Sequence, residues 1–213
     1  MALTLVGAAV LAAAAFGVLR WRADRSPEAG AQLLAEGDAK AAVRVLVNVL
    51  AARPDDARAH YYLGAAYARL GVAPGALKHL EKAVRLAPGE ADFHRGLGAA
   101  YRQAGDRRSA RAELETAVRL EPTEPEHRVT LAGALIDDGE VEDALDHLRR
   151  AAEVRPGSPE IHLLLAMAHK RAGDRDEMLR QLRQVMRLAP DGALGEIARQ
   201  ETRAVAGGSD TAR

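Results

Sequence analysis

Cysteine is absent from this chain of 213 residues. Its absence excludes disulfide bonds, thiolate metal sites and cysteine nucleophiles within the sequence. Aromatic residues are also scarce, at 3% of the chain, whereas alanine, leucine, arginine and glutamate dominate. Because alanine and straight-chain residues lose little rotamer freedom in a helical turn, this composition predicts an all-α fold without a sheet.

The chain has no excess of charge of either sign, since Lys and Arg number 30 and Asp and Glu also number 30. Nucleic-acid binders usually carry a basic surplus, because neutralising phosphates supplies most of their affinity. The charge balance therefore predicts no general nucleic-acid binding. The sequence also lacks a His-Glu-x-x-His motif, a phosphate-cradling loop and a Gly-x-Ser-x-Gly motif. We therefore expect no enzyme, no cofactor and no small-molecule substrate.

Charged residues are missing from positions 2–19. Apolar residues surround the predicted helix on every side, which indicates burial in lipid. Arg20, Trp21 and Arg22 follow it and suit a membrane interface, so we predict a transmembrane anchor over 1–22. The positive-inside rule places the N-terminus outside and the rest of the chain in the cytoplasm. The alternative, a cleaved export signal, lacks the positive residues that would precede the apolar run.

In most of the remaining sequence, the same residue types recur every 34 residues. Proline recurs at Pro54, Pro88, Pro122, Pro156 and Pro190, and glycine recurs 17 residues before each, at Gly37, Gly71, Gly105, Gly139 and Gly173. Two further places keep the same phase: Ala42, Ala76, Ala110 and Ala144, followed by Met178, and Leu46, Leu80, Leu114, Leu148 and Leu182. This self-similarity predicts an α-solenoid built of helical hairpins that are stable only when stacked.

Each repeating residue has a predicted role in its hairpin. The glycine should end the first helix in a left-handed conformation, and the proline should end the second helix. Asp38, Asp106, Glu140 and Asp174 follow four of the glycines and suit the start of the second helix, by capping or through the helix dipole. Small residues such as Gly64 and Ala76 should let the two helices of a hairpin approach closely.

The pattern resembles the tetratricopeptide repeat. The residues that carry the resemblance in the second repeat are His60-x2-Leu63-Gly64-x2-Tyr67, Ala76, Leu80, Ala83 and Pro88, and the third repeat has His94-x2-Leu97-Gly98-x2-Tyr101. Histidine replaces the usual tryptophan, and leucine replaces the usual phenylalanine. The resemblance implies five repeats, over 23–56, 57–90, 91–124, 125–158 and 159–192. We further expect a capping helix over 193–206 and a disordered tail over 207–213.

The resemblance also implies a concave groove, lined by the first helix of each repeat, that binds a partner protein or peptide. In the family, the second, fifth, ninth, twelfth and thirteenth places of a repeat face this groove. From these places we nominate Arg58, Tyr61, Arg69, Arg95, Arg102, Gln103, Lys170 and Arg171. The other three groove places of the fifth repeat are occupied by Glu160, Leu163 and Met167. Because arginine grips carboxylates bidentately, the expected ligand is an acidic or extended peptide. The alternative is that these arginines are ordinary solvated side chains.

Seven histidines raise the question of a metal site. His60, His94 and His162 share the fourth place of their repeats, and packed helices set equivalent places about 10 Å apart. Ligands of one metal ion lie about 2 Å from it, so these histidines cannot share a metal. We therefore predict that they pack where the family has tryptophan, and that no metal is bound.

The repeats predict the type of function only through analogy with similar folds. The leading hypothesis is a membrane-anchored scaffold or adaptor for a protein partner. A second hypothesis is a structural or accessory subunit of a membrane complex, in which the groove need not bind a peptide. A third is an exported assembly factor, which would resemble the repeat proteins of cytochrome c maturation and would need the opposite membrane topology.

Overall fold

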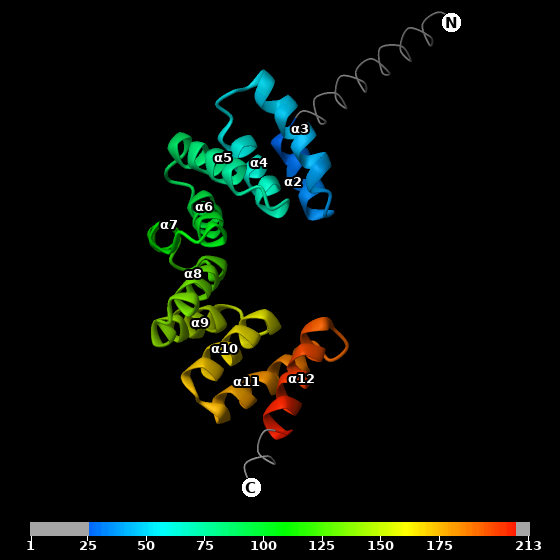
Figure 1. The fold of residues 1–213 in the computed structure, drawn as a ribbon, viewed down its shortest axis with the longest axis vertical. Coiled ribbons are helices and arrows are strands. Elements are labelled where there is room, and N and C mark those ends of the chain that lie inside the picture. Colours follow the sequence, from blue (N-terminus) through cyan, green and yellow to red (C-terminus); the bar gives the residue numbers. More distant parts are fainter. Residues whose placement is uncertain (1–25, 208–213) are drawn as a thin grey trace, which may run out of the picture. The chain divides into compact units, whose positions relative to one another are not determined.

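The computed structural model describes residues 26–207 of the chain. These residues form eleven α-helices and contain no strand (Figure 1). Contacts divide the chain into two compact units, one that ends at Ala104 and one that begins at Gly105. For the described residues, the structure confirms the predicted all-α fold.

The N-terminal unit contains α2 (Pro27–Ala35), α3 (Ala39–Ala52), α4 (Ala57–Arg69), α5 (Ala73–Leu86) and α6 (Ala91–Ala104). Each helix packs against the next along the chain. In addition, α2 contacts α4 and α4 contacts α6, so the first helices of successive repeats lie beside one another. The first of them, α2, is only nine residues long and begins where the Ser26 hydroxyl accepts a hydrogen bond from the amide of Ala29 at 3.2 Å.

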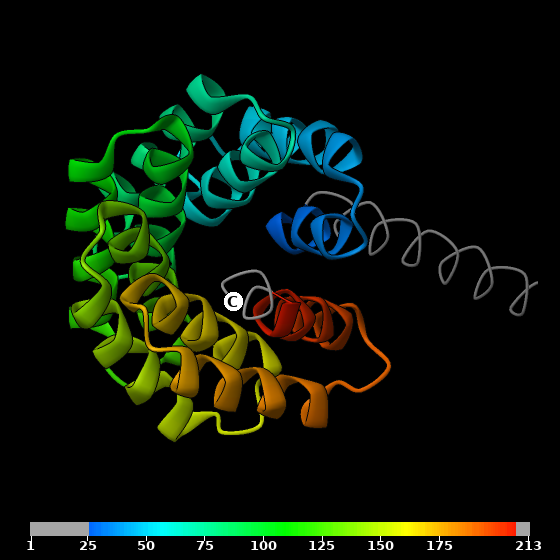
Figure 2. The ribbon, with the colours of Figure 1, turned by 60° about the horizontal axis from the view of Figure 1, so that its bottom comes forward.

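The C-terminal unit contains α7 (Arg107–Leu120), α8 (Pro125–Asp138), α9 (Val141–Val154), α10 (Pro159–Ala172), α11 (Arg175–Leu188) and α12 (Ala193–Gly207). Neighbouring helices again lie side by side, joined by short turns (Figure 2). The first helices α8 and α10 contact each other, and α10 also contacts α12. Because α12 packs against α11 and α10, it stands where the first helix of a further repeat would stand. It occupies the segment for which a capping helix was predicted.

The ends of the helices follow the chemistry that the sequence predicts. All five repeating glycines have positive φ, between 73° and 87°, which confirms their left-handed conformation. The carboxylates of Asp38, Asp106 and Asp174 accept amide hydrogen bonds of 2.8–3.1 Å in the first turn of the second helix. Glu140 makes no such cap at the start of α9. Its carboxylate accepts a hydrogen bond from the guanidinium of Arg111 on α7 instead.

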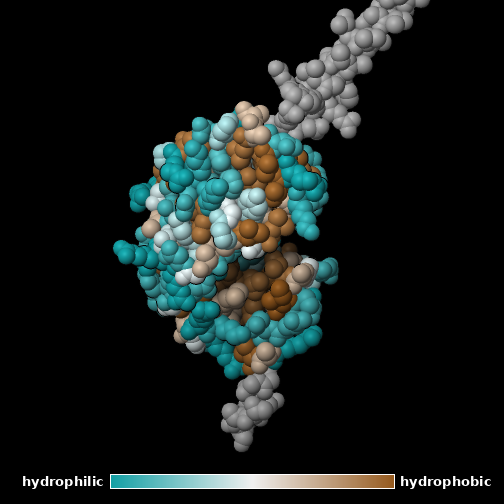
Figure 3. Space-filling model, turned by 45° about the horizontal axis from the view of Figure 1, so that its top comes forward, coloured by the Kyte–Doolittle hydropathy of each residue, from teal (hydrophilic) through white to brown (hydrophobic). Residues whose placement is uncertain are grey.

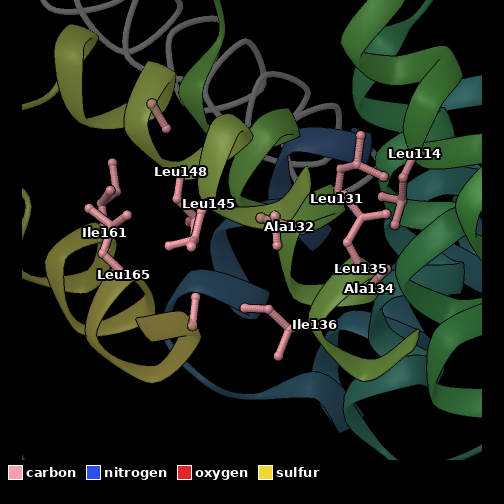
Figure 4. Packing of buried hydrophobic residues seen from close by; sticks show 13 residues of the cluster. Leu114, Leu131, Ala132, Ala134, Leu135, Ile136, Leu145, Leu148, Ile161 and Leu165 are labelled. Carbon is pink, nitrogen blue, oxygen red and sulfur yellow. The ribbon is translucent and has the colours of Figure 1, made fainter. Parts of the chain in front are cut away.

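The five repeating leucines form the centre of the core, since none of them is more than 1% exposed. In the C-terminal unit, Leu114 of α7 lies beside Leu131 of α8, while Leu148 of α9 belongs to the same cluster as Leu165 of α10 (Figure 4). The hairpin formed by α4 and α5 is tight at Gly64, where an added Cβ would lie 2.6 Å from Cγ of Leu80. Burial of large side chains between consecutive helices therefore holds each unit together.

The predicted anchor over 1–22 lies outside the described residues and stays a prediction. Across residues 26–207, no helix combines the length and the apolar character needed to cross a membrane. The predicted disordered tail also lies outside the described residues, apart from Gly207, which is the last residue of α12.

Candidate functional site

The nominated partner-binding residues lie on three first helices. Arg58, Tyr61 and Arg69 are on α4, Arg95, Arg102 and Gln103 are on α6, and Lys170 and Arg171 are on α10. Along α4, Arg58 and Arg69 are eleven residues apart, which corresponds to about 16 Å of helix. The two arginines of this helix are therefore placed near its opposite ends and do not meet at one point.

Tyr61 belongs to an aromatic cluster in the N-terminal unit. Its ring stacks on Phe93 of α6, with ring centroids 4.9 Å apart, and meets Tyr62 edge-on at 5.3 Å. Desolvation raises the pKa of the Tyr61 phenol, and the positive charge of Arg95 opposes this shift. An added Cβ at Gly96 would lie 2.7 Å from Cε2 of Tyr61, so the tyrosine fills the space between α4 and α6. Tyr61 is thus a packing residue as well as a candidate contact.

Two of the nominated arginines form ion pairs on the surface of the N-terminal unit. Arg58 lies 3.6 Å from the Glu28 carboxylate of α2, and both side chains are more than half exposed. Arg95 donates two hydrogen bonds, of 3.1 and 2.7 Å, to one oxygen of Asp92. An acidic ligand would have to compete with these carboxylates, and exposed pairs of this kind contribute only about 0–1 kcal/mol. Binding of an acidic peptide by this arginine face therefore stays a prediction.

Arg69 and Arg171 occupy the same repeat place and make the same contact. Arg69 donates to the carbonyl of Leu34 at the end of α2, and Arg171 donates to the carbonyl of Ile136 at the end of α8, at 2.7 Å. The last carbonyls of a helix lack partners within the helix, and a cation there also interacts favourably with the helix dipole. Both arginines therefore join the first helix of one repeat to that of the preceding repeat.

An apolar pocket opens between α10 and α12 in the C-terminal unit. Its volume is about 370 Å³, within the range of known ligand pockets. The apolar lining consists of Leu163, Ala166, Met167, Met178, Leu182 and Ile197. Met167 of α10 and Ile197 of α12 both line the pocket and remain 48% and 42% exposed, so they present apolar surface together at one site. In the space-filling view of Figure 3, hydrophobic residues are exposed among hydrophilic ones on the viewed face.

The pocket brings together four of the five groove residues that the fifth repeat supplied from sequence, and Glu160, at the second place, is not among its lining residues. Leu163 and Met167 form part of its wall, and Lys170 and Arg171 lie at its rim. Sequence reasoning missed the opposite wall, because Ile197 and Glu201 belong to α12 and not to a repeat. The helical spacing of apolar residues over 193–205 was the signal that could have placed them there.

A family profile described as "Tetratricopeptide repeat" matches residues 28–91 and 95–159, which together make up more than half of the chain. A second profile of the same description matches residues 135–198. This chain belongs to the tetratricopeptide repeat family. The matched segments include every residue nominated for partner binding.

Solved tetratricopeptide structures share the fold. A thermophilic protein from Thermus thermophilus is 25% identical, with a TM-score of 0.73 over 83% of this chain and 97% of that one. MamA from Desulfovibrio magneticus is 22% identical, with a TM-score of 0.66 over 78% and 94% of the two chains. YrrB, described as a tetratricopeptide protein with an unusual peptide-binding site, is 22% identical, with a TM-score of 0.62 over 80% and 88%. No curated protein matches the sequence.

In this tetratricopeptide protein, the residue at the fourth repeat place, where the family has tryptophan, forms a hydrogen bond with the turn that precedes the first helix. Nε2 of His60, His94 and His162 lies 2.9–3.0 Å from the carbonyl oxygen of the proline six residues earlier. In the fourth repeat Arg128 takes this place, and its guanidinium donates to the Pro122 carbonyl at 2.8 and 3.0 Å. Among residues 26–207, no group of three or more His, Asp or Glu residues could hold a metal ion.

Three of these side chains, those of His60, Arg128 and His162, also reach the second helix of their own hairpin. Nδ1 of His60 lies 2.9 Å from Nδ1 of His79, whose ring also stacks near Tyr67 at 5.7 Å. Because the Pro54 carbonyl can only accept, Nε2 of His60 carries a hydrogen. Between the two Nδ1 atoms, one must donate and the other accept. The arrangement therefore does not allow both rings to be positively charged.

The histidine pair predicts a loss of stability on acidification. Burial, with smaller effects from His60 and Lys78, lowers the pKa of His79 from 6.5 to about 4. The unfolded chain would take up this proton near pH 6.5 and the folded chain only near pH 4. The neutral ring therefore stabilises the fold above about pH 6.5, and this stabilisation is lost as the pH falls toward 4. A full shift of that size corresponds to about 3 kcal/mol, and solvent screening at this partly exposed ring reduces the expected loss to about 1 kcal/mol.

Urea unfolding at a series of pH values tests this with the variant His79→Gln. Gln181 is the natural counterpart in the fifth repeat, where its Oε1 lies 2.8 Å from Nδ1 of His162, so the variant keeps a hydrogen-bond partner. We expect the free energy of unfolding to fall less steeply between pH 6.5 and 4 in the variant than in the wild type. Equal slopes would mean that His79 takes up its proton alike in the folded and unfolded chains.

Proposed function

We propose that this protein is a scaffold or adaptor that binds a partner protein through the exposed side of its first helices. The observation that carries the proposal is the apolar pocket between α10 and α12, because residues at partner-facing places of the family line it. Large exposed apolar side chains at one site are typical of interaction surfaces. The peptide-binding site named for YrrB, a protein of similar fold, supports the same kind of role.

Membrane anchoring is the second part of the proposal. It is supported by the uncharged sequence over 2–19 and by the arginines Arg20, Arg22 and Arg25 that follow it. By the positive-inside rule, these arginines keep the repeats on the cytoplasmic side. A partner bound through the first helices would then be held at the membrane surface.

Co-purification of the full-length protein from its native cells tests both parts. We expect the protein to sediment with membranes until detergent releases it, and then to retain a partner that mass spectrometry identifies.

The variant Met167→Asp should reduce recovery of this partner roughly tenfold or more, because it places a charge in the apolar pocket. A second variant, Arg58→Glu with Arg102→Glu, tests the arginine face of the N-terminal unit. Val154→Asp is the matched control, since Val154 is a 56% exposed apolar residue outside the pocket.

Different outcomes separate the hypotheses. Recovery of the same partners, in fixed proportion, with every variant would contradict binding through the first helices and would favour the structural-subunit hypothesis. Loss of the partner only from the arginine variant would place the contact on the N-terminal unit. Release of the wild-type protein from membranes without detergent would contradict the anchor.

A further inference from the structure

The pocket between α10 and α12 presents an apolar surface to a binding partner. The charged groups at its rim are paired within the chain. Lys170 of α10 donates to the carboxylate of Glu201 of α12 at 2.6 Å, across the rim. The guanidinium of Arg171 donates to the Ile136 carbonyl, so it is engaged with the protein itself. Because each of the three charged groups at the rim has a partner inside the chain, a ligand carboxylate would have to break an existing contact. The rim therefore does not favour the acidic peptide that the arginine content predicts.

The apolar wall also restricts the backbone conformation of a ligand. An extended peptide presents its amide and carbonyl groups on both sides, and each group left without a hydrogen bond in an apolar site costs free energy. The wall that Leu163, Met167 and Ile197 form carries no side-chain donor or acceptor for such groups. An α-helix satisfies its own backbone hydrogen bonds and presents only side chains. The wall therefore favours a helical ligand.

The shape of the site agrees with this ligand. Wall residues come from three helices that contact one another, α10, α11 and α12, with α11 at the base, so the ligand would lie against the surface between α10 and α12. An amphipathic helix binds such a groove with apolar side chains spaced three and four residues apart. The flexible side chain of Met167 at the mouth can adapt to aliphatic side chains of different shapes.

We propose that the pocket between α10 and α12 binds the apolar stripe of an amphipathic helix from the partner protein. This inference rests on the proposed function and specifies the chemistry of the partner at that site. Aliphatic side chains provide the contact, and the ion pair between Lys170 and Glu201 stays intact on binding. Affinity should therefore depend little on salt.

Fluorescence anisotropy with designed peptides tests the inference on the full-length protein. The probe is a fluorescein-labelled helix of about four turns, with leucine on one stripe and equal numbers of lysine and glutamate elsewhere. One control peptide has a central proline that breaks the helix, and another has glutamate in place of every leucine. We expect only the first peptide to bind well. Raising the ionic strength from about 0.05 to about 0.5 M should change its Kd less than about threefold.

Protein variants locate the binding site. Met167→Asp and Ile197→Ser should each weaken the probe roughly tenfold, and Val154→Asp should leave it within about twofold of the wild type. All three positions are exposed, and equal melting temperatures by circular dichroism would show that the variants fold. If Ile197→Ser alone lowers the melting temperature, Met167→Asp decides the result.

Three results would overturn the inference. They are equal binding of the proline-broken peptide, tighter binding of the acidic peptide, and no effect of either pocket variant on the probe. Absence of binding by the leucine peptide would overturn it as well. The proposed function would survive all of these, because a partner recovered from cells and lost with Met167→Asp or with the arginine variant would still be bound through the first helices.

Discussion

Truncation of Leu148 to alanine should lower the free energy of unfolding by about 3 kcal/mol, within a range of about 2–5 kcal/mol. Leu148 is fully buried in the main core cluster of the C-terminal unit, together with residues of α8 and α10. The smaller side chain would leave a cavity that rigid neighbouring helices cannot fill completely. Urea unfolding followed by circular dichroism measures the loss.

Leu120→Ala provides the matched control, because Leu120 ends the second helix α7 and is 39% exposed. We expect this variant to lose about 1 kcal/mol or less. Similar losses for Leu120→Ala and Leu148→Ala would contradict the assignment of the repeating leucine to the centre of the core.

Replacement of Gly195 by alanine should weaken the docking of α12 by about 1–3 kcal/mol or more. An added Cβ would lie 2.0 Å from the carbonyl oxygen of Ala189 and 3.2 Å from that of Pro190. These are backbone atoms, so no rotation of a side chain can relieve the clash, and the start of α12 must shift. The shift would displace Ile197 and Glu201 relative to α10 and change the shape of the pocket. We therefore expect a lower free energy of unfolding and weaker binding of the leucine-stripe helix.

Gly192→Ala is the control for this prediction, because a Cβ at Gly192 would meet its nearest atom, Cβ of Ala189, at an ordinary 3.7 Å. It should leave both stability and peptide binding close to the wild type. Hydrogen exchange would localise the effect of Gly195→Ala, with faster exchange expected in α12 than in α8 and α9. Unchanged exchange in α12 would show that the helix tolerates the extra methyl group.

The helix boundaries and the central core residues were predictable from the sequence because the same residue types recur at the same places of successive repeats. A glycine that must adopt positive φ and a proline that cannot continue a helix act locally, and five copies in phase fix the helix boundaries. The burial of Leu46 or Leu148 follows from the same period. Asp38 and Asp106 cap their helices as predicted, because capping depends only on residues three positions away.

Contacts between residues far apart in the sequence were not predictable in this way. Glu140 resembles the capping aspartates in position, but Arg111, 29 residues earlier, takes its carboxylate. The place of Arg69 in its repeat predicts contact with a ligand. In the structure, its guanidinium donates to the carbonyl of Leu34, 35 residues earlier. The wall that α12 adds to the pocket lies outside the repeats, so the family pattern contains no place for it. Which ligand the first helices bind depends on such contacts.

The side-chain contact between the fourth place of a repeat and its second helix affects which residues that place can accept. The partners in the second helix are His79, His147 and Gln181, and each can either donate or accept a hydrogen bond. The residue opposite can therefore change between histidine and arginine without leaving a polar group unsatisfied. An exchange of histidine for arginine at the fourth place of these three repeats should therefore keep the hydrogen bond to the proline carbonyl before the first helix.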